Sequence, residues 1–209
     1  MLTEAKRAEA LEILKETYPD AKPALHFSSP FELLVATMLS AQCTDKQVNK
    51  CTDVLFPVYN TAEDFAKLDF ETLEPYIKSC GVYRNKGKNI LATARILLER
   101  YNGEVPQTRE ELTALPGVGR KTANVVLSNA FGVPAIAVDT HVFRVANRIG
   151  LTEAKDVEHT EQQLMAHIPE SDWGAAHHWL IYHGRQVCAA QRPKCGECPL
   201  KEICEHAVH

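Results

Sequence analysis

The chain has 209 residues, enough to bury one large core or two small ones, and its composition of 45% hydrophobic and 24% charged residues is typical of globular proteins. The net charge of −4 does not indicate a nucleic-acid binder, but it does not exclude one, because such binding depends on a basic face. The longest apolar run, FELLVATML, contains a glutamate and is too short to span a bilayer. The first residues, MLTEAKRAEALEIL, lack the apolar segment of a signal peptide, so we expect a cytoplasmic protein without a membrane partner.

Helix signals follow one another along the chain. The segment SPFE at residues 29–32 has the pattern of a capping box with proline at the first helical position, and TDKQ from Thr44 and TREE from Thr108 repeat the box pattern. Glycines stand where helices are expected to end, at Gly81, Gly103, Gly132 and Gly150. Only PAIAV, residues 134–138, has the character of a strand, and it has no evident partner. We therefore predict an all-α chain with short connecting turns.

The segment TREELTALPGVGRKTANVVLSNAFG predicts a helix, a tight turn and a second helix. In the turn LPGVG, which begins at Leu115, Gly117 and Gly119 permit positive φ angles and a close approach of the backbone. Their amides, next to the N-terminus of the second helix, would form a small nest for an anion such as a phosphate. A simple turn between two helices explains the same pattern, and on these residues alone it is the commoner arrangement.

Arg120 and Lys121 open the second helix, where cations are mildly unfavourable because a helix N-terminus carries partial positive charge. The helix end, the neighbouring arginine and partial burial would together favour the neutral amine of Lys121, which is the nucleophilic form. On its own, Lys121 is better explained as a surface lysine. Asp139 precedes THVFRVANRI and has the position of a helix N-cap, which would also hold its carboxylate in a fixed place.

The spacing C-x6-C-x2-C-x5-C near the end of the chain is formed by Cys188, Cys195, Cys198 and Cys204. Four cysteines within one short segment predict a metal site. Structural zinc commonly uses two close pairs, and only one is present here, whereas a [4Fe–4S] cluster suits longer loops. The spacing alone leaves both possibilities open. The other three cysteines are expected to be ordinary buried thiols.

The segment LPGVGRKTANVVL followed by VDTHVFRVANRIGL resembles the helix-hairpin-helix and Gly-Pro/Asp loop of the DNA glycosylase superfamily, and most closely the endonuclease III family. The resemblance extends from LLVATMLSAQCTD to the cysteines. It implies a bifunctional DNA glycosylase and abasic-site lyase of base excision repair, which removes oxidised pyrimidines and cleaves the strand by β-elimination. It also implies a [4Fe–4S] cluster on the four cysteines, double-stranded DNA with oxidised pyrimidines or abasic sites as partner, and a monomer in the bacterial cytoplasm, associated with the nucleoid.

The resemblance gives roles to individual residues. Lys121 would be the nucleophile that forms a Schiff base, and Asp139 the essential carboxylate. Gln42, and a residue of the CGVYRNK loop that we place at Val82, would fill the space left by a flipped base. Many relatives have a larger leucine at that second position. The other expected DNA-binding residues are Leu115, Gly117, Gly119, His141, Arg192 and Lys194.

The resemblance also implies two helical domains that flank a DNA-binding cleft. Residues 23–133 would form a six-helix domain with the hairpin at about 108–132. Residues 1–22 and 134–209 would form a discontinuous cluster domain, with the cluster loop at 188–204. Two alternatives remain. An adenine-specific glycosylase shares the fold and cluster, although its branch generally lacks the Schiff-base lysine, and a non-enzymatic DNA-binding module would use only the hairpin and the cluster.

Overall fold

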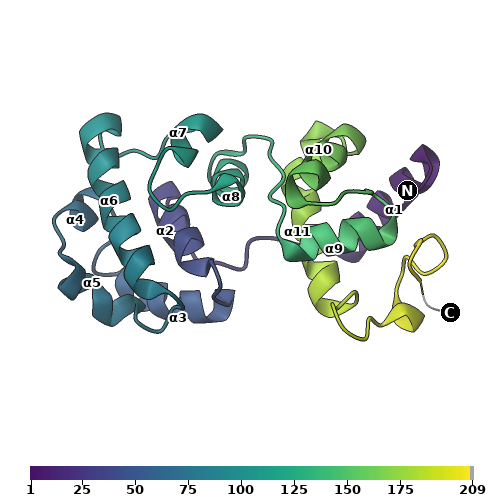
Figure 1. Cartoon of the computed structure of the whole chain (residues 1–209), viewed down its shortest axis with the longest axis horizontal. Coiled ribbons are helices and arrows are strands. Elements are labelled where there is room, and N and C mark those ends of the chain that lie inside the picture. The colour runs from purple at the N-terminus through teal and green to yellow at the C-terminus, as the bar shows by residue number, and fades with distance from the viewer. Residues whose placement is uncertain (208–209) are drawn as a thin grey trace. The chain divides into compact units, whose positions relative to one another are not determined.

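The computed structural model of the chain describes residues 1–207 (Figure 1). These residues form eleven α-helices and two short 3-10 helices, and no strand occurs among them, so the all-α prediction is confirmed. The segment 134–138, which had the character of a strand, is an irregular stretch whose apolar side chains from Ala135 to Val138 are buried. Within the described residues, no helix is long and apolar enough to cross a membrane.

The chain folds into two compact units, one made of residues 23–133 and one made of residues 1–22 with the described residues from Pro134 onward. The first unit contains seven α-helices where six were expected from the resemblance. Two of the seven are only five residues long, which is close to the shortest length that counts as a separate helix. Its helices are α2 (Pro30–Ser40), α3 (Asp45–Leu55), α4 (Ala62–Ala66), α5 (Phe70–Ile77), α6 (Tyr83–Tyr101), α7 (Arg109–Thr113) and α8 (Arg120–Phe131).

Helix α2 forms the centre of the first unit. All side chains from Phe31 to Leu39 are buried, which explains why this helix is almost entirely apolar. It packs against α3, α6 and α8. The predicted cap is confirmed, because the backbone N–H of Glu32 donates to Ser29 Oγ at 3.1 Å and Pro30 occupies the first turn.

The second unit combines the N-terminal helix with the last third of the chain. Its helices are α1 (Glu4–Thr17), α9 (Thr140–Ile149), α10 (Val157–His167) and α11 (Trp173–Gln186), with 3-10 helices η1 (Glu170–Asp172) and η2 (Cys195–Glu197). Helix α11 packs against both α9 and α1, and side chains of all four α-helices share one apolar core. Leu200, which lies between the last two cysteines of the C-terminal loop, is fully buried in that core. The cysteine loop is thereby anchored to the helices.

Candidate active site and cluster site

The predicted hairpin is formed by α7, the turn LPGVG and α8. Leu115 is buried and anchors the turn. Gly117 has a φ of +75°, which favours glycine, whereas Gly119 has a φ of −93° and is the N-cap of α8. The left-handed conformation expected for both glycines therefore occurs at Gly117 alone. No described side chain caps the N-terminus of α8, so its first amides remain available to an anion.

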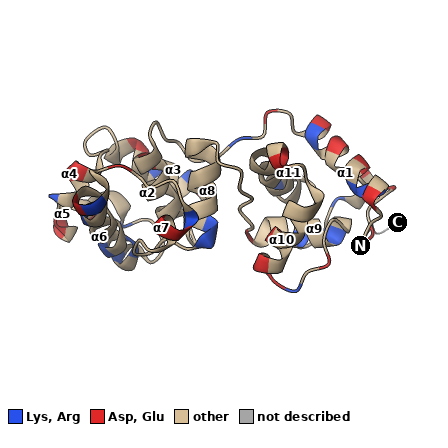
Figure 2. Ribbon diagram, turned by 90° about the horizontal axis from the view of Figure 1, so that it is seen from above, with Lys and Arg blue, Asp and Glu red and all other residues tan. Residues whose placement is uncertain are grey.

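Lys121 is the second residue of α8, directly after Arg120, and Figure 2 shows basic residues where this helix begins, next to α7. Its side chain is exposed, so the partial burial expected from the sequence is not found. This surface therefore has an accessible amine beside backbone amides that can hold an anion.

Asp139 is the N-cap of α9. Its Oδ1 accepts hydrogen bonds from the backbone N–H groups of His141 at 2.8 Å and Val142 at 2.9 Å. The carboxylate is half-buried and held in one position by the helix that it caps. His141, in the first turn of the same helix, has its Nδ1 3.3 Å from the guanidinium of Arg144.

Four non-glycine residues among residues 1–207 have a left-handed backbone, with φ between 52° and 56°. Asn102 is one of them, and asparagine tolerates this conformation at the C-cap that it forms. The other three are Gln42, Val82 and Arg192, all of which the sequence analysis associates with DNA. Such backbones cost about 1–3 kcal/mol and gather at functional sites, and for a β-branched valine they are rare.

The two expected wedge residues belong to neighbouring loops of the first unit. A Cβ atom added to Gly81 would lie 3.1 Å from the carbonyl oxygen of Gln42, so the backbones of the two loops are in contact. Gln42 is exposed, and Val82, which follows Gly81, has 55% of its surface exposed. The fold therefore brings together two accessible side chains that are 40 positions apart in the sequence.

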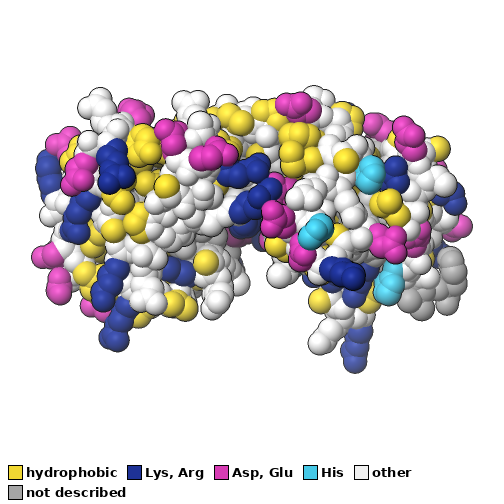
Figure 3. Space-filling view, turned by 45° about the horizontal axis from the view of Figure 1, so that its top comes forward, with side chains coloured by type: hydrophobic (Ala, Val, Ile, Leu, Met, Phe, Trp, Pro, Cys, Tyr) yellow, Lys and Arg dark blue, Asp and Glu magenta, His cyan; other side chains and the backbone are white. Residues whose placement is uncertain are grey.

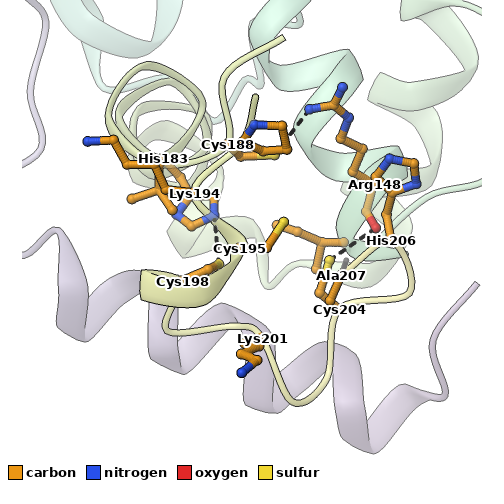
Figure 4. Close-up of a pocket in the computed structure, with 13 residues that line it drawn as sticks. Arg148, His183, Cys188, Lys194, Cys195, Cys198, Lys201, Cys204, His206 and Ala207 are labelled. Carbon is orange, nitrogen blue, oxygen red and sulfur yellow. Dashed lines mark hydrogen bonds between the residues drawn. The ribbon is translucent and has the colours of Figure 1, made fainter. Parts of the chain in front are cut away.

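The four C-terminal cysteines line one pocket of the second unit, together with Arg148 and His183 (Figure 4). Among residues 1–207, no three metal-binding side chains converge closely enough to hold a single ion. A [4Fe–4S] cube takes one thiolate at each of four separated corners, so a set of four thiols around one pocket fits the cube better than it fits zinc. The residues present are thus suited to an iron–sulfur cluster.

Two arginines of α9 hold the loop that carries the first of these cysteines. Arg148 Nη1 donates to the carbonyl of Ala189 at 2.7 Å and lies 3.7 Å from Sγ of Cys188. Arg144 Nη2 donates to the carbonyls of Gly184 and Cys188, each at 3.1 Å. These contacts assign both arginine side chains to the support of the loop.

A buried histidine connects helix α1 to the same pocket. His183 Nε2 lies 3.6 Å from Sγ of Cys198, and Nδ1 lies 3.0 Å from the hydroxyl of Tyr18. Burial lowers the pKa of His183 to about 4, and burial together with the nearby Cys198 raises the pKa of Tyr18 to about 12. The sequence signal for this contact is the apolar segment HHWLIYHG, in which His183 lies five positions before the first cysteine.

Basic residues are not gathered in one patch on the face that Figure 3 shows. Figure 3 shows Lys and Arg side chains interspersed with acidic ones. Arg192 and Lys194 are exposed in the first part of the cysteine loop, as a DNA contact requires. Lys86, which stands between Arg84 and Lys88 in the sequence, is buried, and its Nζ donates to the carbonyl of Leu39 at 2.8 Å. Lys86 therefore cannot serve as a phosphate contact.

Residues 35–170 match the family described as HhH-GPD superfamily base excision DNA repair protein, and residues 188–204 match the iron-sulfur binding domain of endonuclease III. Endonuclease III of Escherichia coli (strain K12) is 52% identical over 205 residues, which are 98% of this chain and 97% of that protein. The chain belongs to the endonuclease III family. Endonuclease III of Bacillus subtilis (strain 168) is 53% identical over 195 residues, 93% of this chain and 89% of the relative.

Solved structures of endonuclease III agree with this assignment. A trapped covalent intermediate of endonuclease III with DNA, an estranged-adenine complex, is 50% identical with a TM-score of 0.95, and the match covers 99% of this chain and 98% of the other. As a member of the family, the chain is a bifunctional DNA glycosylase and abasic-site lyase of base excision repair, and it holds a [4Fe–4S] cluster.

Proposed function

We propose that this member of the endonuclease III family acts on double-stranded DNA that contains oxidised pyrimidines or abasic sites, with Lys121 as its nucleophile. The observation that carries the proposal is the position of Lys121, an exposed amine in the first turn of an uncapped helix that follows a glycine turn. A related endonuclease III has been trapped in a covalent intermediate with DNA. A lysine amine that attacks the sugar explains such an intermediate chemically.

In the proposed reaction, the damaged nucleotide is turned out of the duplex. The neutral amine of Lys121 attacks C1′ of the sugar, and the bond from C1′ to the base breaks. The C1′–O4′ bond of the sugar then opens, O4′ takes up a proton and an iminium forms between C1′ and the lysine nitrogen. This iminium withdraws electrons and acidifies the protons at C2′. Loss of one of these protons and departure of the 3′ phosphate complete the β-elimination. Base removal and strand cleavage then share one nucleophile.

Asp139 has a different role in the proposal. Its carboxylate supports the positive charge that develops at the sugar as the base leaves, as carboxylates do in glycoside hydrolysis. The hydrogen bonds from His141 and Val142 occupy one oxygen, Oδ1, and hold the group in place without taking its charge. The capping and catalytic roles are therefore compatible.

Extrusion of a base costs a few kcal/mol of stacking and pairing, which new contacts must offset. We assign this task to Gln42 and Val82, because both are exposed, lie on loops in contact with each other and have left-handed backbones. The amide of Gln42 would bond with the orphaned base. The isopropyl group of Val82 would supply apolar contact, although less of it than the leucine of many relatives.

The remaining contacts in the proposal hold the DNA backbone. The turn at Gly117 and Gly119 and the first amides of α8 would bind one phosphate, with Leu115 as the buried anchor of the turn. His141 and the exposed Arg192 and Lys194 would bind others. When bound, the cluster supplies iron–thiolate bonds that fix the loop between Cys188 and Cys204. We also propose a monomer that works at the nucleoid, with the two compact units as its two DNA-binding domains.

Borohydride reduction during turnover tests the nucleophile. Wild-type protein and a Lys67→Gln control, which changes an exposed lysine paired with Glu63, should both give a covalent adduct with an abasic duplex, located at Lys121 by peptide mapping. Lys121→Gln should give none. An undiminished adduct with Lys121→Gln would reject this nucleophile. A panel of duplexes with single defined lesions tests the substrate class, and preference for mispaired adenine over oxidised pyrimidines would favour the adenine-specific alternative.

A further inference from the structure

The three cysteines outside the cluster loop form a cluster of their own in the first unit. Cys43 lies in the loop after α2, Cys51 lies in α3 and Cys80 follows α5. The thiol of Cys80 donates to Sγ of Cys51 at 3.6 Å, and Cys43 also contributes, after burial and Cys51, to the raised pKa of Cys80. The residues next to Cys80 and Cys43, Gly81 and Gln42, have their backbones in contact. Cys80 therefore has two possible partners for a disulfide, Cys43 and Cys51. The spacing of these cysteines in the sequence did not indicate this arrangement.

The three thiols differ in their access to solvent. Cys51 and Cys80 are buried, whereas Cys43 is partly exposed. Burial, and next the contact with Cys51, raises the pKa of Cys80, so this thiol is a poor first target for an oxidant. Cys43 stands directly before Thr44, the N-cap of α3, and the buried amine of Lys86 is close enough to interact with both Cys43 and Cys80. Helix N-termini and lysines are typical surroundings of reactive cysteines.

Two of these cysteines are next to the proposed wedge residues. Cys43 follows Gln42 directly, and Cys80 is separated from Val82 only by Gly81. The backbones of these two loops are in contact at Gly81 and Gln42. A covalent bond between Cys43 and Cys80 would therefore join the two loops beside their left-handed residues.

We propose that Cys43 and Cys80 are a peroxide-sensitive modification site, at which oxidation forms a disulfide that joins the two wedge loops. Cys43 attacks one oxygen of hydrogen peroxide, the O–O bond breaks, and a sulfenic acid and one water form. Cys80 then gives its proton to the hydroxyl of this sulfenic acid while its sulfur attacks the sulfur of Cys43. The S–O bond breaks, and a second water leaves as the S–S bond forms. The peroxide is reduced and the two thiols are oxidised.

The disulfide changes DNA binding in this proposal, and that consequence depends on the roles proposed above for Gln42 and Val82. Sulfur atoms in a disulfide are about 2 Å apart, closer than thiols in van der Waals contact, and their torsion is narrowly restricted. The bond therefore restricts the movement of both loops. Oxidation should weaken binding to a duplex with an abasic-site analogue, and a thiol reductant should restore the binding.

The experiment uses the cluster-loaded protein and hydrogen peroxide at low excess, with the visible absorbance of the cluster monitored throughout. Free thiols are alkylated, and linked peptides are identified by mass spectrometry. We expect loss of the free thiols of Cys43 and Cys80 and a peptide that joins them. Cys80→Ser should stop at the sulfenic acid of Cys43, whereas Cys51→Ser, which changes the other neighbour of Cys80, should still form the bond.

Three outcomes contradict the proposal: all three thiols stay reduced, Cys51 is the residue joined to Cys80, or the bond forms with no change in DNA affinity. The reduced protein is assayed in parallel for the borohydride adduct at Lys121. Failure of that adduct rejects the proposed nucleophile and leaves the disulfide mapping valid. A normal adduct without the disulfide rejects the modification site alone.

Discussion

The side chain of His183 lies against Cys198, with Nε2 3.6 Å from Sγ. Its other nitrogen faces the hydroxyl of Tyr18 at 3.0 Å. A tyrosine hydroxyl can donate to Nδ1, so the proton of the neutral ring is assigned to Nε2, which points at the sulfur. Histidines and carboxylates that contact metal ligands fix the ligand and tune the metal site. This contact therefore connects α1 to the cluster through two hydrogen bonds.

His183→Phe should weaken retention of the cluster. It removes a hydrogen bond to a thiolate, and bonds to charged groups contribute about 1.5–3 kcal/mol. Tyr18→Phe keeps the histidine and should have a smaller effect. Iron and sulfide content, and the rate of iron loss to a chelator, measure the difference. Equal retention in His183→Phe and wild type would show that the sulfur does not need this donor.

Asp139→Asn separates the two roles of Asp139. Asparagine is as good an N-cap as aspartate, so the free energy of unfolding should stay within about 0.5 kcal/mol of the wild-type value. Glycosylase activity should fall steeply because the charge is lost. Asp139→Ala should lose the activity and in addition about 1 kcal/mol of stability. Chemical denaturation and a single-turnover assay check both parts, and an active Asp139→Asn would leave this residue as a cap only.

Local signals in the sequence predicted local structure well. Ser29, Thr44 and Thr108 all cap helices through their side-chain oxygens, as their spacing indicated. Gly132 and Gly150 end α8 and α9 in left-handed conformations. These features are formed by residues three or four positions apart, so neighbours in the sequence determine them.

Contacts between distant segments were not predictable in the same way. Lys86 belongs to a basic run in the sequence, yet its amine bonds to Leu39, 47 positions earlier. Arg148 meets Ala189 41 positions later, and His183 meets Tyr18 165 positions earlier. The sequence around a lysine, arginine or histidine is the same whether its side chain lies in solvent or bonds to a buried group. Only tertiary packing distinguishes the two.

Asp69 should make stability depend on pH at the acidic end. It caps α5, and the hydrogen bonds from Thr72 lower the pKa of its carboxyl. A lowered folded-state pKa stabilises the protein above the unfolded-state pKa, and this contribution is lost as the pH falls through the folded-state pKa. Asp69→Asn should remove that contribution, so its thermal midpoint should approach the wild-type midpoint as the pH falls from about 5 to 2. Asp20→Asn changes an aspartate outside any helix cap and is the control. The difference between its thermal midpoint and the wild-type midpoint should be the same across this pH range.

Arg192 and Lys194 should contribute to affinity through phosphates. If roughly four phosphates are bound, the affinity of the wild type should fall by about two orders of magnitude between about 50 and 200 mM salt. Arg192→Gln and Lys194→Gln should each reduce the slope of log affinity against log salt by about 1. Lys67→Gln, at an exposed lysine paired with Glu63, is the control and should not change the slope. Unchanged slopes in both loop variants would exclude these two contacts.

The two glycines of the hairpin should respond in opposite ways to substitution. Gly117 has a φ of +75°, and an added Cβ would lie 2.7 Å from Asn89 Nδ2, so Gly117→Ala should destabilise the protein by about 1–3 kcal/mol. Gly119 has an extended backbone and no described atom within 4 Å of an added Cβ. Gly119→Ser therefore fits without strain.

In Gly119→Ser, the new hydroxyl can cap α8 and should stabilise the fold by a few tenths of a kcal/mol. That hydroxyl would occupy the amides that we assign to a phosphate, so DNA affinity should fall while stability rises. Thermal unfolding and fluorescence anisotropy with a lesion-free duplex measure the two quantities on the same sample. A variant with higher stability and undiminished affinity would show that the N-terminus of α8 does not hold a phosphate.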